Sequence, residues 1–300
     1  MYSQILIPLD GSATAEKVLP YARFLAGMLK LPVELLGVID LATIATHLSA
    51  ENTRYFDSVV VQEERRSQTY LEGIARTFSG GAVRCTVEKG KPEEVIIEKG
   101  AAKNVTLIAM ATHGRSGVKR WLLGSVAEKV LRGGRSPLLL IRAQEEAKTE
   151  GEAVLQSLIV PLDGSGLAES ALPTVSALAR VMNLEVILCR AYELPTGAYY
   201  GSEDYLPNYD ELLAGLRQET SDYLKGQVAV IKSQELEKVS AVTLEGAVAE
   251  EIIQYARKSP NSLVAMCTHG RSGVERWVLG SVTEKVVRYS GNPVLVLRAP

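Results

Sequence analysis

Short apolar runs alternate with longer segments in which apolar residues recur at helical spacing, and this order occurs twice along the chain. Continuous rather than alternating apolarity is typical of a strand covered on both faces. The first run, Gln4–Leu9, is followed at once by Asp-Gly-Ser, and the run Ser157–Leu162 is followed by the same three residues. The pattern therefore predicts buried parallel strands separated by helices.

Each half is expected to contain five strands and four main helices. The expected strands are Gln4–Leu9, Pro32–Val38, Val83–Glu88, Thr106–Met110 and Leu138–Arg142, then Ser157–Leu162, Glu185–Arg190, Val239–Leu244, Ser262–Met266 and Val294–Arg298. The expected helices are Ala13–Leu29, Ser58–Ser79, Pro92–Ala101 and one from Ser125, then Gly166–Met182, Tyr209–Ser233, Ala247–Lys258 and one from Ser281. This alternation predicts the α/β class, with a parallel sheet covered by helices on both faces.

The two halves are copies of one domain. Residues Thr112–Arg132 recur as Thr268–Arg288 with 17 identities in 21 positions, and Ile5–Ser12 recurs as Leu158–Ser165. Internal duplication of this kind indicates tandem domains. We expect a first domain over residues 1–143, a polar and charged linker over 144–155, and a second domain over 156–300.

Composition narrows the function. The net charge of −2 argues against a nucleic-acid binder that relies on positive charge, and 46% hydrophobic residues exclude a disordered chain. No uncharged apolar stretch reaches the ~18–20 residues of a membrane helix, and the first residues lack a basic leader segment. Three cysteines without metal-ligand spacing suit buried thiols in a reducing compartment. We therefore expect a cytoplasmic protein with no metal site of its own.

Polar residues cluster where the expected strands end. Asp10-Gly-Ser follows the first strand, Val38-Ile-Asp ends the second, and Thr112–Gly117 follows the fourth. In open parallel sheets, ligands bind beyond the carboxyl ends of the strands, where the strand order reverses. These segments, with Gly124-Ser125, are thus expected to converge on one edge.

Glycine spacing next to a helix start suggests an anion site. Gly114 is followed after nine residues by Gly124-Ser125, and Gly270 by Gly280-Ser281. Glycine allows close approach to a ligand, and a helix N-terminus attracts phosphate. In the alternative interpretation, the glycines serve only to form turns and the serines serve only to cap helices.

With these motifs, the chain resembles a tandem universal stress protein over almost its whole length. The resemblance rests on Ile-Pro-Leu-Asp-Gly-Ser and on Thr-His-Gly-Arg-Ser-Gly followed by Trp-x-Leu-Gly-Ser-Val. It implies two Rossmann-like, five-stranded domains of the adenine nucleotide alpha hydrolase-like type. In family dimers the last strands pair, so the two repeats are expected to form a pseudo-dimer within one chain. A homodimer of the tandem chain is a further expectation.

One subclass of the family binds ATP through Gly, two residues, Gly, nine residues, then Gly and Ser or Thr. The resemblance carries nucleotide contacts to these positions: Pro8, Asp10, Val38, Ala111, His113, Gly114, Gly124, Ser125 and Val126 in the first repeat, and Pro161, Asp163, Ala191, Cys267, His269, Gly270, Gly280, Ser281 and Val282 in the second. Asp10 and Asp163 are expected near the adenosine, Val38 and Ala191 at the adenine. The serine segments are expected at the phosphates.

The sequence departs from this pattern at its first glycine, which is Ala111 in one repeat and Cys267 in the other. If that position needs positive φ, a side chain costs about 1 kcal/mol. Site two is then more doubtful than site one. Asp10 and Asp163 could instead cap the first helix, a role that Ser12 and Ser165 could share.

Turnover is not expected to be fast. The chain has no GxxxxGK[ST] and no GxGxxG motif, and no carboxylate stands at a fixed short spacing to orient His113 or His269 as a base. A loop histidine bonded to backbone is the simpler interpretation of both. Magnesium is expected only if a triphosphate lies beside Asp10 or Asp163.

Three functions follow from this reading. The leading one is a stress-response module that binds ATP or another adenine nucleotide, such as AMP, and acts as a switch toward a protein partner that the sequence does not identify. The rivals are a nucleotide-free scaffold and a slow ATPase. A tyrosine cluster over residues 192–223 is unmatched in the first repeat, and predicts either a lid or interface near the second site, or a loop packed on its own helix.

Overall fold

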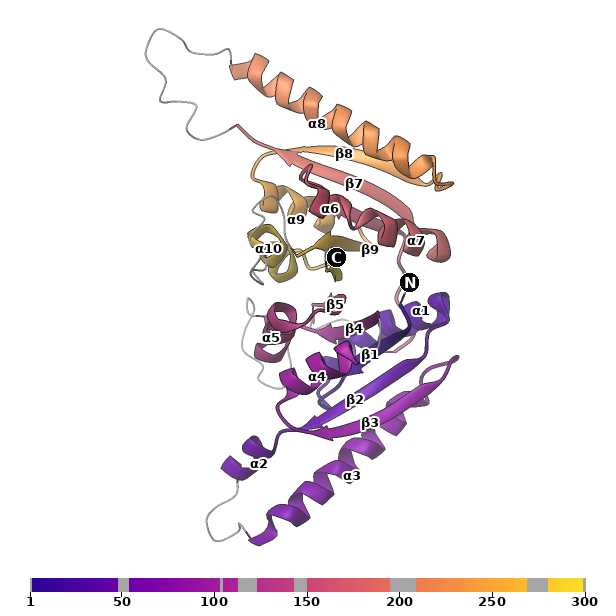
Figure 1. Ribbon diagram of the computed structural model, residues 1–300, viewed down its shortest axis with the longest axis vertical. Helices are drawn as coiled ribbons and strands as arrows, with labels where there is room; N and C mark the ends of the chain where they lie inside the picture. The colour runs from indigo at the N-terminus through magenta and orange to yellow at the C-terminus, as the bar shows by residue number, and fades with distance from the viewer. Residues whose placement is uncertain are drawn as a thin grey trace, which may run out of the picture. The chain divides into compact units, whose positions relative to one another are not determined.

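The chain divides into two compact units, Met1–Val154 and Leu155–Pro300 (Figure 1). The computed structural model describes residues 2–47, 54–102, 105–112, 123–142, 150–194, 209–268 and 280–298. Each unit is built around one fully parallel sheet, which confirms the α/β fold class predicted from the alternating pattern.

The first unit has the strand order β3-β2-β1-β4-β5. Its strands are β1 (Gln4–Pro8), β2 (Val33–Ile39), β3 (Val83–Lys89), β4 (Thr106–Ala111) and β5 (Leu138–Ile141). Its helices are the 3-10 turn η1 (Ala15–Val18), α1 (Leu19–Leu29), α2 (Leu41–His47), α3 (Phe56–Ala75), α4 (Pro92–Ala101) and α5 (Ser125–Gly133). Because β1 has β2 on one side and β4 on the other, the order reverses at β1, and a crevice opens between the carboxyl ends of β1 and β4.

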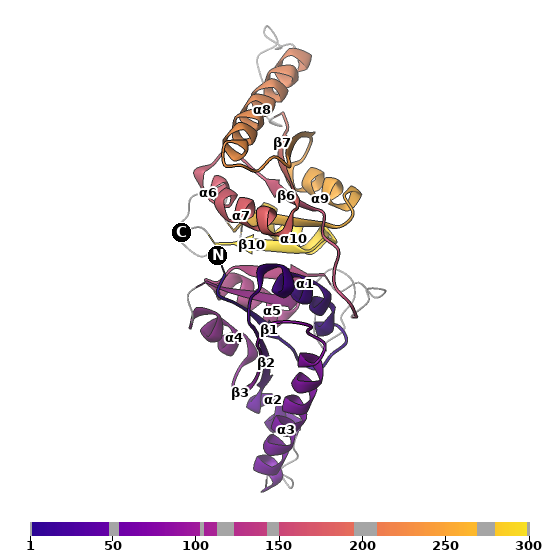
Figure 2. The ribbon, with the colours of Figure 1, turned by 90° about the vertical axis from the view of Figure 1, so that its right-hand side faces the viewer.

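The second unit repeats this order as β8-β7-β6-β9-β10. Its strands are β6 (Ser157–Pro161), β7 (Glu185–Tyr192), β8 (Val239–Glu245), β9 (Ser262–Cys267) and β10 (Val294–Leu297). Its helices are α6 (Gly166–Glu169), α7 (Leu172–Met182), α8 (Tyr209–Lys232), α9 (Val248–Lys258) and α10 (Ser281–Tyr289). Figure 2 shows α6, α7 and α8 on one side of this sheet and α9 on the other.

Side-chain contacts define the same two layers. In the first unit, Tyr70 of α3 donates a hydrogen bond to Glu16 of η1, and in the second Tyr223 of α8 donates one to Glu169 of α6. On the opposite layer, Lys129 of α5 pairs with Glu93 of α4. Lys285 of α10 pairs with Glu250 of α9 in the same way.

The helix expected over Ala13–Leu29 is interrupted, and so is the one over Gly166–Met182. Each is a short first turn, η1 or α6, followed by a longer helix, α1 or α7. Pro20 and Pro173 stand at the start of the longer helices. A proline has no N–H to bond the carbonyl four residues earlier, so the first turn does not continue through it.

The segment between β2 and α3 contains a helix that the apolar pattern did not predict. Asp40 accepts hydrogen bonds from the N–H groups of Ala42 and Thr43 and from the Thr43 hydroxyl, and so caps α2. The hydrogen bond from Thr43 lowers the pKa of the Asp40 carboxyl. The expected helix Ser58–Ser79 is displaced, since α3 begins at Phe56 and ends at Ala75.

The helices α3 and α8 are the longest in the structure, with 20 and 24 residues. Both carry charged residues along their length. Within the ranges that the structure describes, no helix has both the length and the apolar character needed to cross a membrane.

The core of each unit is its central strand and the helices against it. Ile5, Leu6 and Ile7 are fully buried, as the continuous apolar run predicted. The polypeptide before the second unit is anchored on the first: Arg23, buried on α1, donates to the carbonyl of Gly151 at 2.7 Å and to Thr77 at 2.9 Å. The pairing of the last strands between repeats stays a prediction.

Helix α5 carries Ser125 at its start and buries its other face, so its packing sets where that serine lies. We predict that Leu131→Ala, at a fully buried position of α5, lowers the free energy of unfolding by about 2–5 kcal/mol, because a cavity replaces the lost side chain. Urea unfolding followed by circular dichroism measures this. Leu212→Ala, the same change at a partly exposed position of α8, is the control. A cost as large there would contradict the explanation that the loss at Leu131 comes from a buried cavity.

The Glu93–Lys129 pair predicts a pH dependence. The hydrogen bond from Lys129 lowers the pKa of the Glu93 carboxyl. The folded protein therefore holds this proton less tightly than the unfolded chain, and the pair stabilises the fold at neutral pH but loses its effect as the pH falls through the lowered pKa.

Because Lys129 is largely exposed, Glu93→Gln should cost no more than about 1 kcal/mol at pH 7, and the cost should shrink once the pH falls below about 4.5, the ordinary pKa of a glutamate. Urea unfolding between pH 3 and pH 7 measures it. Glu94→Gln breaks a more exposed pair, with Lys91 at the cap of the same helix, and should cost less. A cost for Glu93→Gln that is constant across this pH range would refute the stabilising role of the Glu93–Lys129 pair.

Candidate functional site

A pocket lies at the carboxyl edge of each sheet, at the point where the strand order reverses. The first has a volume of about 290 Å³. It is lined by Pro8 at the end of β1, Leu9 and Asp10 after it, Ala15 of η1, Leu36 and Val38 of β2, Pro92 and Ile96 of α4, Met110, Ala111 and Thr112 at the end of β4, and Gly124, Ser125, Val126 and Ala127 at the start of α5.

The second pocket has a volume of about 680 Å³. It is lined by Pro161, Leu162, Asp163, Ala168, Arg190, Ala191, Tyr192, Glu193, Leu216, Glu219, Thr220, Val248, Ile252, Met266, Cys267, Gly280, Ser281, Val282 and Thr283. It matches the first pocket at the ends of the strands and at the start of α10, and extends further onto α8.

The structure brings together most of the residues that the sequence singled out. Pro8, Asp10, Val38, Ala111, Gly124, Ser125 and Val126 all line the first pocket, and Pro161, Asp163, Ala191, Cys267, Gly280, Ser281 and Val282 all line the second. His113, Gly114, His269 and Gly270 lie outside the described residues.

The Asp-Gly-Ser turns have the same geometry in both units. The N–H and the hydroxyl of Ser12 donate to Asp10 Oδ1 at 3.0 and 2.6 Å, and those of Ser165 donate to Asp163 Oδ1 at 2.9 and 2.6 Å. Each serine oxygen in turn accepts from a backbone N–H three residues on. Ser165 is therefore the cap of α6, whereas Ser12 accepts from the first residue of η1; in both units the aspartate holds the serine and presents its carboxylate to the pocket.

Thr112 and Gly124, which flank the segment after β4, both lie at the rim of the first pocket. The N–H of Gly124 donates to the carbonyl of Thr112, and the N–H of Gly280 donates to that of Thr268 at 2.6 Å. Helix α5 then begins at Ser125 with Gly124 as its cap residue. Because glycine has no side chain to cap the first turn, the free N–H groups of that turn are left for a ligand in the pocket. The dipole of the helix favours an anion there.

The first-glycine position does not need positive φ. Ala111 ends β4 and Cys267 ends β9, and neither is among the non-glycine residues with positive φ in the described part of the chain. The departure therefore carries no backbone strain in either unit. The Cys267 thiol lies 3.5 Å from the Ser170 hydroxyl, and burial raises its pKa.

The structure confirms the expectations for the cysteines and for the tyrosine cluster only in part. All three cysteines are free, but Cys85 is half-buried whereas Cys189 and Cys267 are buried. Of the cluster, Tyr192 lines the second pocket and donates to Glu245, and Tyr223 packs on α6 through Glu169. Residues 195–208 lie outside the described ranges, so the choice between a lid and a packed loop stays open.

Sequence reasoning missed the walls that come from helices. Pro92 and Ile96 of α4 and Val248 and Ile252 of α9 close one side of each pocket. They carry no chemical motif, and only the topology, in which α4 and α9 start at the carboxyl edge of the sheet, could have indicated them. Among the described residues, no three His, Cys, Asp or Glu side chains are grouped to hold a metal ion.

Comparison with known proteins agrees with this architecture. The family described as "Universal stress protein family" matches residues 1–142 and again 155–298. Universal stress protein MJ0531 of Methanocaldococcus jannaschii is 30% identical over 150 residues, which cover 50% of this chain and 86% of that protein.

Other known proteins match over nearly the whole chain. Universal stress protein Rv2005c of Mycobacterium tuberculosis is 22% identical over 98% of this chain and 96% of its own. The crystal structure of a universal stress protein from Archaeoglobus fulgidus has a TM-score of 0.67 at 22% identity, covering 99% of both chains. With the family matched once in each unit, this chain belongs to the universal stress protein family as a tandem, two-domain member.

Proposed function

We propose that each unit binds an adenine nucleotide in the pocket at the carboxyl edge of its sheet, and that occupancy of these pockets makes the protein a stress-response switch. The proposal rests on the matching walls of the two pockets, each of which lies within its own unit. In both, the Asp-Gly-Ser turn, the end of the second strand and the first turn of the last helix face one cavity.

The chemistry of each wall suits one part of the nucleotide. The first turn of α5 or α10 offers backbone N–H groups and the hydroxyl of Ser125 or Ser281, which favour phosphate oxygens. Val38 and Ala191 present a strand end and a small apolar side chain for the flat face of adenine. Asp10 and Asp163 supply carboxylates suited to ribose hydroxyls.

The ATP pattern of the family supports the same assignment, with Gly124-Ser125 and Gly280-Ser281 in the positions of its last two residues. The departure at Ala111 and Cys267 does not oppose it, since both are ordinary strand residues. With a triphosphate, a magnesium ion beside Asp10 or Asp163 would offset the charge. The ribose contact and the ion are alternatives for that carboxylate.

The role proposed is binding rather than turnover. In the described residues around either pocket, no side chain stands with an orienting partner in the arrangement of a general base. A nucleotide that is held but turned over slowly can act as a switch, because it stabilises the bound conformation by its own binding free energy.

Calorimetric titration of nucleotide-stripped protein with Mg-ATP tests the proposal. We expect two sites per chain. Ser125→Ala should weaken one site and Ser281→Ala the other, each by about 10- to 100-fold, because a hydrogen bond to a charged oxygen is worth about 1.5–3 kcal/mol.

Ser58→Ala, at an exposed serine of α3 that lines neither pocket, is the matched control and should change neither site. Absence of binding heat at several temperatures would favour the scaffold function instead. Hydrogen exchange with and without Mg-ATP reports the switch: protection confined to the pocket walls would argue against a conformational change.

A further inference from the structure

Among the described lining residues, the second pocket contains an arginine and the first contains none. With Asp10 matched to Asp163, the register of the two sheets matches Gly37 of β2 to Arg190 of β7. At Gly37 an added Cβ would clash with the Ser67 hydroxyl of α3, so this position is closed in the first unit. In the second unit the side chain of Arg190 passes into the pocket wall, and the cavity is more than twice as large.

The Arg190 guanidinium is held in place but poorly partnered. Its Cζ lies 4.7 Å from the centre of the Tyr223 ring, and it packs against Gly164, where an added Cβ would lie 3.5 Å from Nη1. Gly164 has φ +84°, so this turn both requires glycine and leaves room for the guanidinium. The cation therefore has a fixed position between α8 and the Asp-Gly-Ser turn.

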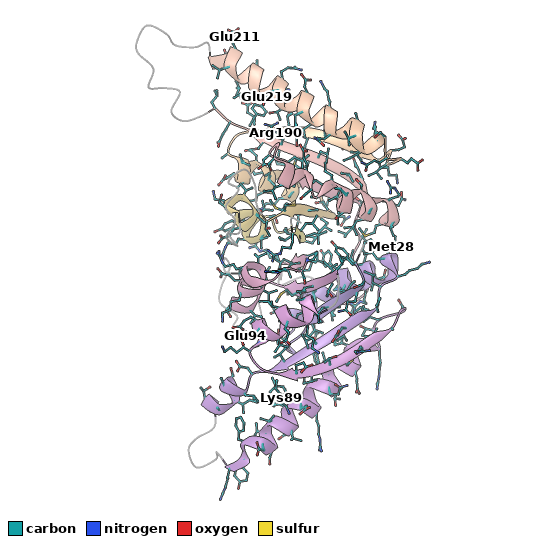
Figure 3. All side chains as sticks on the ribbon, in the orientation of Figure 1. Met28, Lys89, Glu94, Arg190, Glu211 and Glu219 are labelled. Carbon is teal, nitrogen blue, oxygen red and sulfur yellow. The ribbon has the colours of Figure 1, made fainter. Side chains whose placement is uncertain are left out.

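Its hydrogen-bonding capacity is unused within the described part of the chain. The side chain is only 13% exposed, yet its one ionic contact is Nη2 to Glu219 Oε1 at 3.7 Å, beyond hydrogen-bond distance. Arg190 and Glu219 lie across from each other on β7 and α8 (Figure 3). A guanidinium carries five N–H donors in a planar fork that suits phosphate, and leaving them unmatched at a nearly buried position is costly.

The surrounding carboxylates leave room for an incoming anion. Glu219 is 70% exposed and can turn to solvent, and Glu193 is also exposed. The third carboxylate, Asp163, is held at Oδ1 by Ser165. An anion that replaces the distant Glu219 contact would gain direct hydrogen bonds from Arg190.

The place of Arg190 in the fold indicates which end of a nucleotide it would meet. It belongs to the layer of α6 and α8, whereas Ser281 begins α10 in the layer of α9. It adjoins Ala191, the proposed adenine contact, and Gly164, which follows Asp163. A phosphate at the start of α10 would thus lie on the other layer, and Arg190 would face the ribose.

We propose that Arg190 makes the second pocket selective for adenine nucleotides that carry an additional phosphate on the ribose, whereas the first pocket has no such preference. This inference rests on the nucleotide binding proposed above. The chemistry is the recognition of a ribose phosphate by an arginine beside the ribose, as dinucleotide-binding folds use for a 2′-phosphate. The two units of one chain would then report different nucleotides.

Titration of the intact chain with AMP, adenosine 2′,5′-bisphosphate and adenosine 3′,5′-bisphosphate tests it. We expect one of the two sites to bind at least one bisphosphate about tenfold or more tightly than AMP, and the other site to show less than a threefold difference. In Arg190→Gln the selective site should lose its preference while AMP still binds at both sites. Arg190→Lys should keep part of the preference, because the charge remains.

Arg180→Gln removes an exposed arginine of α7, in the same unit but outside the pocket lining, and should leave the selectivity unchanged. A merely structural role of Arg190 would lower affinity for AMP and the bisphosphates alike, and the ratio between them would not move. Equal ratios at both sites in the unaltered protein, or an unchanged ratio in Arg190→Gln, would overturn the inference. Failure of AMP itself to bind would remove the proposed function and this inference together.

Discussion

The reversal of strand order at the central strand is the constraint on which the rest of each unit depends. Because β1 pairs with β2 on one side and β4 on the other, the connections that leave the carboxyl ends of β1 and β4 go to opposite layers. Within the part of the chain that the structure describes, no connection covers the edge between them, and a crevice results. The Asp-Gly-Ser turn, the end of β4 and the start of α5 all lie at that crevice.

The same constraint explains why the two pockets have matching walls and yet differ in volume. The shared residues come from strand ends and from the last helix, whose positions the sheet determines. The difference comes from one position in the second strand and the helix that covers it. Where Gly37 meets α3 closely, the first cavity stops. Where Arg190 takes its place, the cavity continues toward α8. A duplicated domain can therefore keep one site architecture while the cavities of its copies differ in volume and lining.

The polar turns at the pocket also show how a helix cap and a binding group can be separated. Ser12 and Ser165 accept the backbone hydrogen bonds of the first turn, while Asp10 and Asp163 hold those serines. With the serine in that role, the carboxylate stays at the edge of the sheet, where a ribose or an ion could meet it.

The sequence by itself determined the duplicated α/β architecture, the strand positions and the residues at the carboxyl edge, because buried parallel strands and their turns are local patterns repeated in both halves. The apolar pattern did not predict the breaks before Pro20 and Pro173, where a backbone donor is missing, or the cap of α2 by Asp40, where side-chain hydrogen bonds start a helix. The walls from α4 and α9 and the reach of Arg190 were decided only by the tertiary structure. They depend on which elements lie side by side in the fold, and residues distant in sequence meet there without any motif of their own.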